Sequence, residues 1–173
     1  MRKVIVNSNL NDLYHRCADD LVEVGARSIS RSGQFTLVLS GGSTPFGLYE
    51  LLAKSPYRER VSWDRVHLFW GDERCVPPDD PDSNFRLAQE QLIAPLGIPQ
   101  TNLHRIKGEL RVPEETAREY ESDLTGFFNL QVGELPRFDL ILLGLGTDGH
   151  TASLFPSDSS SQEQDRLVIA TQS

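Results

Sequence analysis

The sequence predicts one α/β domain, residues 1–173, built on an open and mostly parallel sheet with helices on both faces, as in doubly wound, Rossmann-like folds. Short apolar runs alternate along the chain with longer segments of helical periodicity, and this order produces parallel strands covered by helices. Three of the apolar runs end in glycine-containing loops, and open sheets of this kind bind ligands beyond the carboxyl ends of their strands. A chain of 173 residues has the length of a single domain.

The first half of the chain predicts three strands around a long helix. Residues 3–7 are rich in β-branched side chains and predict an edge strand. Asn11 is the expected N-cap of the helix, because apolar residues follow it at helical spacing until Gly33, which is the expected end. Residues 35–39 and 65–70 are short apolar runs that predict buried strands.

The second half continues the alternation. A helix is expected to begin near Ser83, followed by a short strand at residues 103–106 and a second long helix at 113–130. Residues 138–143 form an almost unbroken apolar run that ends at glycine, which predicts a strand buried on both faces of the sheet. A last apolar run, residues 167–170, predicts one more strand.

Composition limits the classes of partner. The net charge of −8 argues against nucleic acid or a membrane surface as the main partner, and no segment approaches transmembrane length. The cysteines Cys17 and Cys75 form neither a disulfide framework nor a zinc spacing. The histidines lack ligand spacing as well, so we expect no metal and no cofactor. With no signal peptide pattern at the start, we expect a reducing, cytoplasmic compartment.

The first strand-end loop has the composition of an anion site. It reads SGGSTP at residues 40–45 and leads directly into a helical pattern. The peptide groups of Gly41 and Gly42 are accessible, Ser40, Ser43 and Thr44 add hydroxyl donors, and the start of the helix adds positive potential. The alternative is that Ser43 or Thr44 only caps the helix. We favour a phosphate site.

The second strand-end loop, GDERCVP at residues 71–77, carries a charged triplet. Asp72 and Glu73 are adjacent, so in extended chain they point in opposite directions and do not form a facing pair. Arg74 has the planar fork that binds phosphate or carboxylate in two places. The residues leave the alternative open that this is a solvated charged loop.

The third strand-end loop, GLGTDGHTASLFP at residues 144–156, places Asp148 and His150 in a glycine-rich turn. A carboxylate and an imidazole above a rigid strand are typical of a reaction centre. The same stretch matches the G-x-G-x-x-G pattern of dinucleotide sites, which also requires a following helix and a later acidic residue at the end of the next strand. Pro156 interrupts too early, and the next apolar run leads into Thr171, so we reject a dinucleotide site.

Together, and in this order, these loops closely resemble those of the 6-phosphogluconolactonases of the pentose phosphate pathway, over nearly the whole chain. Glucosamine-6-phosphate deaminases and isomerases are similar in scaffold but typically read Met-Asp-Glu-Tyr where this chain has GDERCVP. After the histidine they typically run Ile-Ala-Phe-Asn-Glu-Pro, whereas this chain has TASLFP and therefore lacks the glutamate that works with the deaminase histidine. The resemblance therefore favours the lactonase.

The resemblance implies a substrate and a set of roles. The expected partner is a small sugar-phosphate lactone, 6-phospho-D-glucono-1,5-lactone, with no nucleic acid and no membrane. His150 would deprotonate water, Asp148 would orient its imidazole or stabilise its protonated form, and Arg74 would bind phosphate or polarise the lactone carbonyl. The loop from Gly41 to Thr44 would hold the 6-phosphate.

Two alternatives stay open. The first is isomerisation or deamination of an amino-sugar phosphate, with Asp72 as the base and His150 opening the ring. The second is a catalytically silent module that binds sugar phosphates. Proteins that resemble this one continue for tens of residues beyond the strand expected at 167–170, so the resemblance also implies that a C-terminal part, with a basic residue near the phosphate, is missing.

Overall fold

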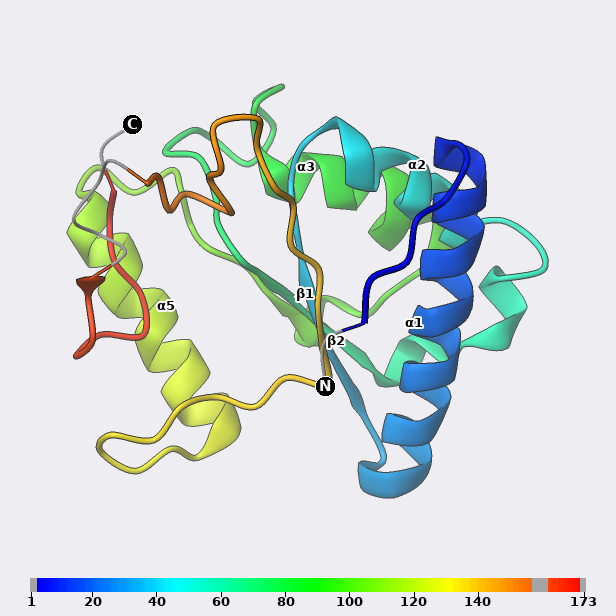
Figure 1. The fold of residues 1–173 in the computed structure, drawn as a ribbon. Helices are drawn as coiled ribbons and strands as arrows, with labels where there is room; N and C mark the ends of the chain where they lie inside the picture. Colours follow the sequence, from blue (N-terminus) through cyan, green and yellow to red (C-terminus); the bar gives the residue numbers. More distant parts are fainter. Residues whose placement is uncertain (1–2, 157–161, 172–173) are drawn as a thin grey trace.

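The structure is a computed structural model that describes residues 3–156 and 162–171. Its centre is a parallel sheet with the strand order β3-β2-β1-β4 (Figure 1). The two inner strands, β1 (Phe35–Leu39) and β2 (Val66–Trp70), pair along their whole length. The outer strands, β3 (Leu103–His104) and β4 (Leu140–Ile141), are short. The predicted α/β fold with a parallel sheet is confirmed.

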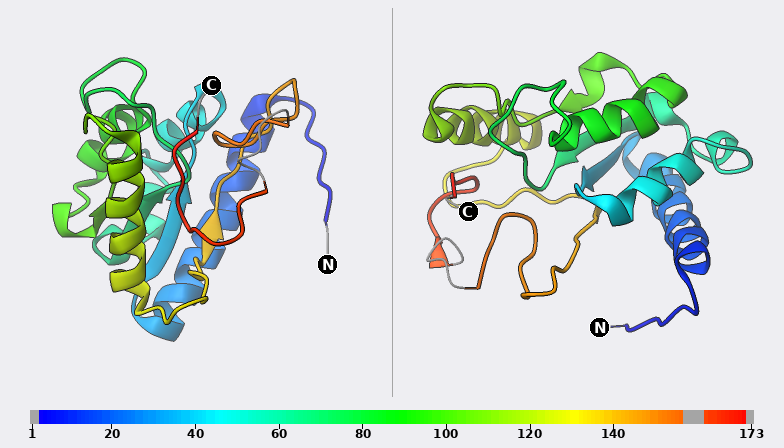
Figure 2. Two further views of the ribbon diagram at one scale, coloured as in Figure 1. Left: turned by 90° about the vertical axis from the view of Figure 1, so that its left-hand side faces the viewer. Right: turned by 90° about the horizontal axis from the view of Figure 1, so that it is seen from above.

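Helices cover both faces of the sheet (Figures 1 and 2). One face carries α1 (Leu10–Ser32), α2 (Ser43–Leu52) and α3 (Asn84–Ala88), and α3 continues through a π-helical turn, Gln89–Ile93, into α4 (Ala94–Leu96). The opposite face carries α5 (Pro113–Phe128). Short 3₁₀ turns lie at Arg58–Arg60, Trp63–Arg65 and Gln100–Asn102.

The hydrophobic core follows the alternation of side chains along β1 and β2. Leu37 and Leu68 point into the larger cluster beneath α1 and α2, and both are fully buried. Val38 and Phe69 point to the other face, where Tyr120 and Leu124 of α5 cover them. Each fully buried leucine side chain stabilises the fold by about 1.5–3 kcal/mol, so the two inner strands form a rigid base for the loops that follow them.

Two predictions at the amino end need correction. Residues 3–7 form no strand in the structure, and Val4 and Val6 are 72% and 88% exposed, because no neighbouring strand pairs with this segment. The N-cap of α1 is Asn9 and not Asn11, since the Asn9 side chain accepts a 2.9 Å hydrogen bond from the backbone N–H of Asp12. The predicted end is confirmed, with Gly33 in the left-handed conformation.

Three predicted strands are shorter or absent. The strand expected at residues 103–106 covers only Leu103–His104. The helix expected at 113–130 also ends early, at Phe128, because Asn129 adopts the left-handed conformation. Within 138–143 only Leu140–Ile141 pairs as a strand, and it is an edge strand and not buried on both faces, since Ile141 is 48% exposed. Residues 167–170 are irregular and half-buried rather than a strand, with Val168 packed on the smaller core cluster.

Candidate functional site

The predicted loops meet at the carboxyl end of the sheet, at the top of Figure 1. They enclose a cleft of about 290 Å³ between the start of α2, the loop after β2 and the loop after β4. The cleft brings together almost all of the residues that the sequence predicted for the site. Its lining includes Ser40, Gly41, Gly42, Ser43, Thr44, Asp72, Arg74 and His150.

The first loop places the hydroxyl residues Ser43 and Thr44 at a helix start. Gly42 is the N-cap of α2, with φ of +95°, a conformation that a residue with a side chain rarely adopts. No side chain caps this helix, so the alternative that Ser43 or Thr44 serves as the cap is wrong. Both hydroxyls line the cleft instead, beside the unpaired N–H groups of the first turn, which is the arrangement that binds anions.

A buried tyrosine fixes where this loop begins. The Tyr49 hydroxyl donates a 2.7 Å hydrogen bond to the carbonyl of Ser40 and accepts one of 3.1 Å from its N–H. Burial raises the pKa of the Tyr49 phenol, so the hydroxyl stays protonated and keeps its donor. Tyr120 holds the peptide of Trp70 in the same way at the end of β2. A buried tyrosine therefore holds the carboxyl end of each inner strand by two hydrogen bonds, at the point where the loop begins.

In the second loop, Asp72 and Glu73 have different surroundings, as the sequence predicted. The Glu73 carboxylate accepts hydrogen bonds from the backbone N–H groups of Arg74, Asn84 and Phe85 and from the Ser83 hydroxyl, so it holds the start of α3. Asp72 lines the cleft. Arg74 is exposed at the same cleft, and no ion pair involves it within the residues that the structure describes.

Asp72 is held by residues that the sequence did not point to. Its Oδ1 accepts a 3.2 Å hydrogen bond from Nδ2 of Asn84, and its Oδ2 accepts one of 2.9 Å from the hydroxyl of Ser153. Asn84 belongs to α3 and Ser153 to the loop after β4, so the two contacts join three parts of the cleft wall. The Ser83–Asn84 pair marks a helix start in the sequence, but nothing in the sequence marks the contact of Asn84 or of Ser153 with Asp72.

The third loop forms a histidine–carboxylate pair. Nδ1 of His150 lies 2.5 Å from Oδ1 of Asp148, and the same oxygen accepts from the backbone N–H of His150 at 3.2 Å. The hydrogen bond from His150 lowers the pKa of the Asp148 carboxyl below its ordinary value. An ionised Asp148 makes Nδ1 the protonated nitrogen, which leaves Nε2 as the atom with a free lone pair. His150 lines the cleft, and Asp148 supports it from outside.

The turn that carries this pair depends on Gly146. A Cβ atom there would lie 2.2 Å from both Nδ1 and Cε1 of His150, so only glycine leaves space for the ring. The N–H of Gly146 donates a 2.8 Å hydrogen bond to the carbonyl of His150, and the Thr151 hydroxyl donates one of 2.8 Å to the carbonyl of Gly144. Turns continue from the glycines to Pro156, so the helix that a dinucleotide motif requires does not follow them directly.

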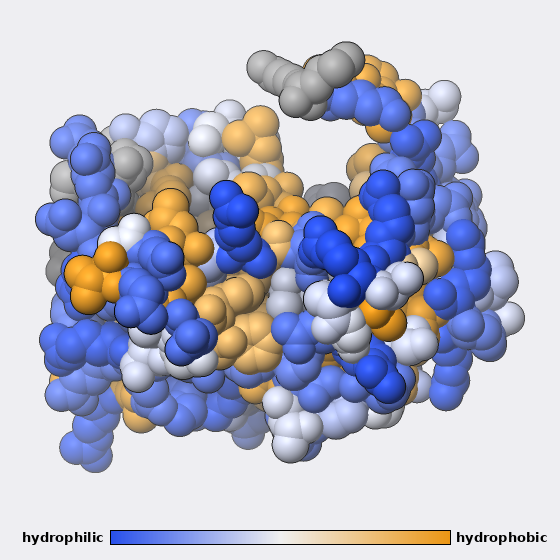
Figure 3. Space-filling view, turned by 90° about the horizontal axis from the view of Figure 1, so that it is seen from below, coloured by the Kyte–Doolittle hydropathy of each residue, from blue (hydrophilic) through white to orange (hydrophobic). Residues whose placement is uncertain are grey.

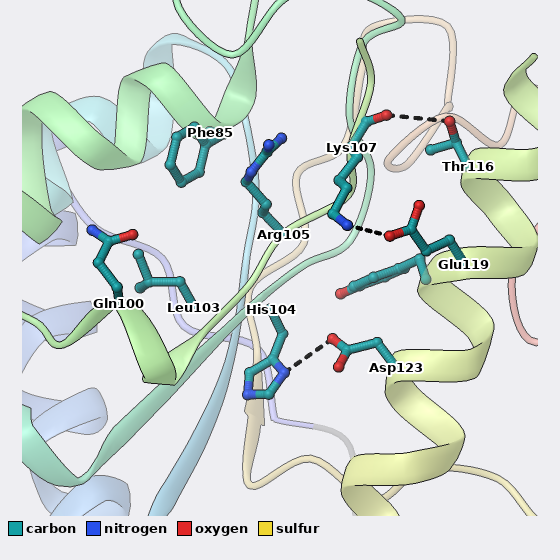
Figure 4. A pocket seen from close by; sticks show the side chains of 10 residues that line it. Phe85, Gln100, Leu103, His104, Arg105, Lys107, Thr116, Glu119 and Asp123 are labelled. Atoms are coloured by element: carbon teal, nitrogen blue, oxygen red, sulfur yellow. Dashed lines mark hydrogen bonds and ion pairs between the residues drawn. The ribbon is translucent and has the colours of Figure 1, made fainter. Parts of the chain in front are cut away.

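A second pocket, of about 300 Å³, lies away from this cleft, between β3 and α5 (Figure 4). His104 contacts Asp123 there through Nδ1 at 3.0 Å, and its Nε2 lies 3.3 Å from Nδ1 of His67. Lys107 forms an ion pair with Glu119. The charged groups of this pocket are therefore largely paired with one another, which suits a packing role between β3 and α5.

Among residues 3–156 and 162–171, no group of three or more His, Cys, Asp or Glu side chains is arranged to hold a metal ion. Within the same residues, no helix has the length and apolar character needed to cross a membrane.

Comparisons of this chain with known proteins agree on one family. The model of the family described as "Glucosamine-6-phosphate isomerases/6-phosphogluconolactonase" matches residues 8–173. The chain is 47% identical over 142 residues to a 6-phosphogluconolactonase of Synechocystis sp., which is 82% of this chain and 58% of that protein. It therefore spans a little under three fifths of the length of that curated relative.

Solved structures agree. The crystal structure of a devB protein matches with a TM-score of 0.84 and 38% identity, over 96% of this chain and 68% of that one. A 6-phosphogluconolactonase from Trypanosoma cruzi matches with a TM-score of 0.82 and 30% identity, over 96% of this chain and 67% of that one. The chain belongs to the glucosamine-6-phosphate isomerase/6-phosphogluconolactonase family.

Proposed function

We propose that this chain carries the catalytic loops of a 6-phosphogluconolactonase, which hydrolyses 6-phospho-D-glucono-1,5-lactone to 6-phospho-D-gluconate in the second step of the oxidative pentose phosphate pathway. The observation that carries the proposal is the His150–Asp148 pair, whose His150 shares one cleft with a glycine turn and the hydroxyl residues Ser43 and Thr44. The names of its relatives in this family support the lactone as substrate. The unpaired cysteines Cys17 and Cys75 fit a reducing, cytoplasmic setting.

In the proposed reaction, His150 is the general base. Its Nε2 takes a proton from a water molecule while the water oxygen attacks the lactone carbonyl carbon, and a tetrahedral intermediate forms. The bond from that carbon to the ring oxygen then breaks, and the proton on Nε2 passes to the ring oxygen, which becomes the 5-hydroxyl of the product. Asp148 stabilises the imidazolium between these two steps, because its carboxylate accepts the hydrogen bond from Nδ1.

The remaining residues bind and orient the substrate. The first turn of α2, with Ser43 and Thr44, is proposed to bind the 6-phosphate, because it offers unpaired N–H groups and hydroxyls in one place. Arg74 adds a cation at the same cleft, where it binds phosphate or polarises the lactone carbonyl. Asp72 faces the cleft as an acceptor for a sugar hydroxyl.

The test measures two possible activities of the same purified protein, each with its own substrate. The purified protein is given 6-phosphoglucono-δ-lactone, and acid release is followed above the rate of spontaneous hydrolysis. In parallel it is given glucosamine 6-phosphate, and ammonia is measured. Acid without ammonia supports the lactonase, whereas ammonia supports the deaminase, in which Asp72 would be the base. Tight binding of 6-phosphogluconate with neither product would indicate a silent binding module.

A further inference from the structure

Asn84 is a buried polar residue in the wall of the cleft. It is 5% exposed, it is the first residue of α3, and its backbone N–H is held by Glu73 at 2.7 Å. Its side-chain Nδ2 donates hydrogen bonds to the backbone carbonyl of Asp72, at 3.0 Å, and to the Asp72 carboxylate, at 3.2 Å. Both partners are acceptors, so the orientation of the amide is fixed with nitrogen toward Asp72 and oxygen away from it.

The other side of the same amide touches the first loop. A Cβ atom built on Gly41 would lie 1.8 Å from Oδ1 of Asn84 and 2.2 Å from its Cγ. No other heavy atom comes nearer to that position, so the absence of a side chain at Gly41 is what allows the amide to pack there. The Asn84 side chain thus fills the space between the glycine turn and Asp72.

We propose that Asn84 is a positioning residue that sets the glycine turn and the Asp72 carboxylate relative to each other. Through the amide, a displacement of either one moves the other, while Ser153 holds the second carboxylate oxygen at 2.9 Å. This inference rests on the proposed function for its catalytic consequence, since it assigns the turn to the phosphate and Asp72 to a sugar hydroxyl. It predicts that Asn84 sets how well one substrate molecule can contact the glycine turn and Asp72 at the same time.

The chain offers a matched control in Asn102. This asparagine is 7% exposed, and its Nδ2 also donates two hydrogen bonds, to the backbone carbonyls of Asp64 and Val66 at 2.9 and 3.1 Å. Asn102 and these two partners all lie outside the lining of the cleft. Replacing each asparagine by aspartate keeps the shape and removes a buried donor, so both variants lose folding stability from that loss, and only Asn84→Asp also places two carboxylates against each other. A difference in kcat/KM between Asn84→Asp and Asn102→Asp therefore reports the role of Asn84 in the cleft rather than a general loss of stability.

In Asn84→Asp, the new carboxylate stands where Nδ2 now lies, 3.2 Å from Oδ1 of Asp72. Two carboxylates at that distance share a proton, so the acid limb of kcat/KM against pH should move to higher pH. At neutral pH, kcat/KM should fall by about 10²-fold, because the carboxylate and the turn shift relative to the substrate. Asn102→Asp should leave the pH profile and the kcat/KM of the folded fraction unchanged.

A double-mutant cycle tests the contact with the glycine turn directly. Gly41→Ala should weaken binding of 6-phosphogluconate, measured by calorimetry, by roughly tenfold or more, because its methyl group collides with the amide. In an Asn84→Ala background the space is free, and most of that loss should disappear. Additive losses in the cycle, or identical pH profiles for Asn84→Asp and Asn102→Asp, would overturn the inference.

The outcome also separates this inference from the proposed function. If the wild-type protein releases no acid from the lactone, the proposed function fails, and the cycle repeated with inorganic phosphate still tests the contact. If the wild-type protein is active and the cycle is additive, the function stands and the positioning role is wrong.

Discussion

Replacing Gly146 by alanine should separate catalysis from binding at this site. The added Cβ would lie 2.2 Å from Nδ1 and Cε1 of His150, whereas ordinary van der Waals contacts begin at 3.4 Å, so the ring must retreat by 3.4 − 2.2 = 1.2 Å. Such a movement breaks the 2.5 Å contact with Asp148 and displaces Nε2 from the attacking water. A displacement of about 1 Å typically costs on the order of 10²-fold in rate, so kcat should fall by that amount.

The assay is steady-state lactone hydrolysis, corrected for spontaneous hydrolysis, together with the affinity for 6-phosphogluconate. The affinity should change by less than about threefold, because Gly146 does not belong to the turn proposed to bind phosphate. Gly144→Ala is the matched control in the same loop, since its Cβ would meet only Ser40 Oγ, at 3.9 Å. If Gly146→Ala retained normal kcat, or if Gly144→Ala were equally damaged, the assignment of His150 as an Asp148-supported base would be refuted.

Three further outcomes follow from other parts of the molecule. Arg74→Lys should weaken binding of 6-phosphogluconate more than it lowers kcat, because an ammonium does not reproduce a bidentate fork, and unchanged affinity would mark Arg74 as a solvated surface residue. Burial, helped by His104, lowers the pKa of His67, so protons bind more readily to the unfolded chain and the free energy of unfolding should fall as pH drops below about 6.5. Denaturant titrations of His67→Phe should show a smaller fall, and an identical slope would contradict the assignment. A polypeptide of residues 1–173 should self-associate in sedimentation experiments through the open β4 edge, where Leu143 is 64% exposed, and Leu143→Lys should reduce this; a monomeric wild-type polypeptide would contradict it.

The parts of the fold that the sequence predicted well are those in which local pattern and burial agree. The fully buried run at β1 and the long amphipathic helix ending at Gly33 lie where expected, because their side chains alone determine which face is buried. The strands expected near the two ends of the chain were predicted wrongly. Residues 3–7 and 167–170 have strand-like composition, but a strand also needs a partner, and within the described structure neither segment has one.

The side of the sheet that carries β4 is less well covered than the sequence predicted. Seen from below, apolar surface gathers in the middle of the molecule between hydrophilic flanks (Figure 3). The run at 138–143, expected to be buried on both faces, is only partly covered, since Ile141 is 48% and Leu143 64% exposed.

The site was predicted as a set of loops but not as a network of contacts. Glycine, hydroxyl and charged residues at strand ends are visible in the sequence, and the sheet brings them together because parallel strands end at one edge. The roles of His150 and Asp148 came from the resemblance, and the sequence alone does not fix their contact, since residues two positions apart in a turn need not touch. The hydrogen bonds of Asn84 and Ser153 to Asp72 could not be predicted, because they depend on how distant loops fold back over the cleft.

The most direct test of His150 as the general base compares the wild-type protein with His150→Gln in hydrolysis of 6-phosphoglucono-δ-lactone. Glutamine retains polar contacts but accepts no proton near neutral pH, so kcat should fall by roughly 10²–10⁴-fold while affinity for 6-phosphogluconate is nearly unchanged. A His150→Gln variant with near-normal turnover would show that another group is the base, and the proposed mechanism would be wrong.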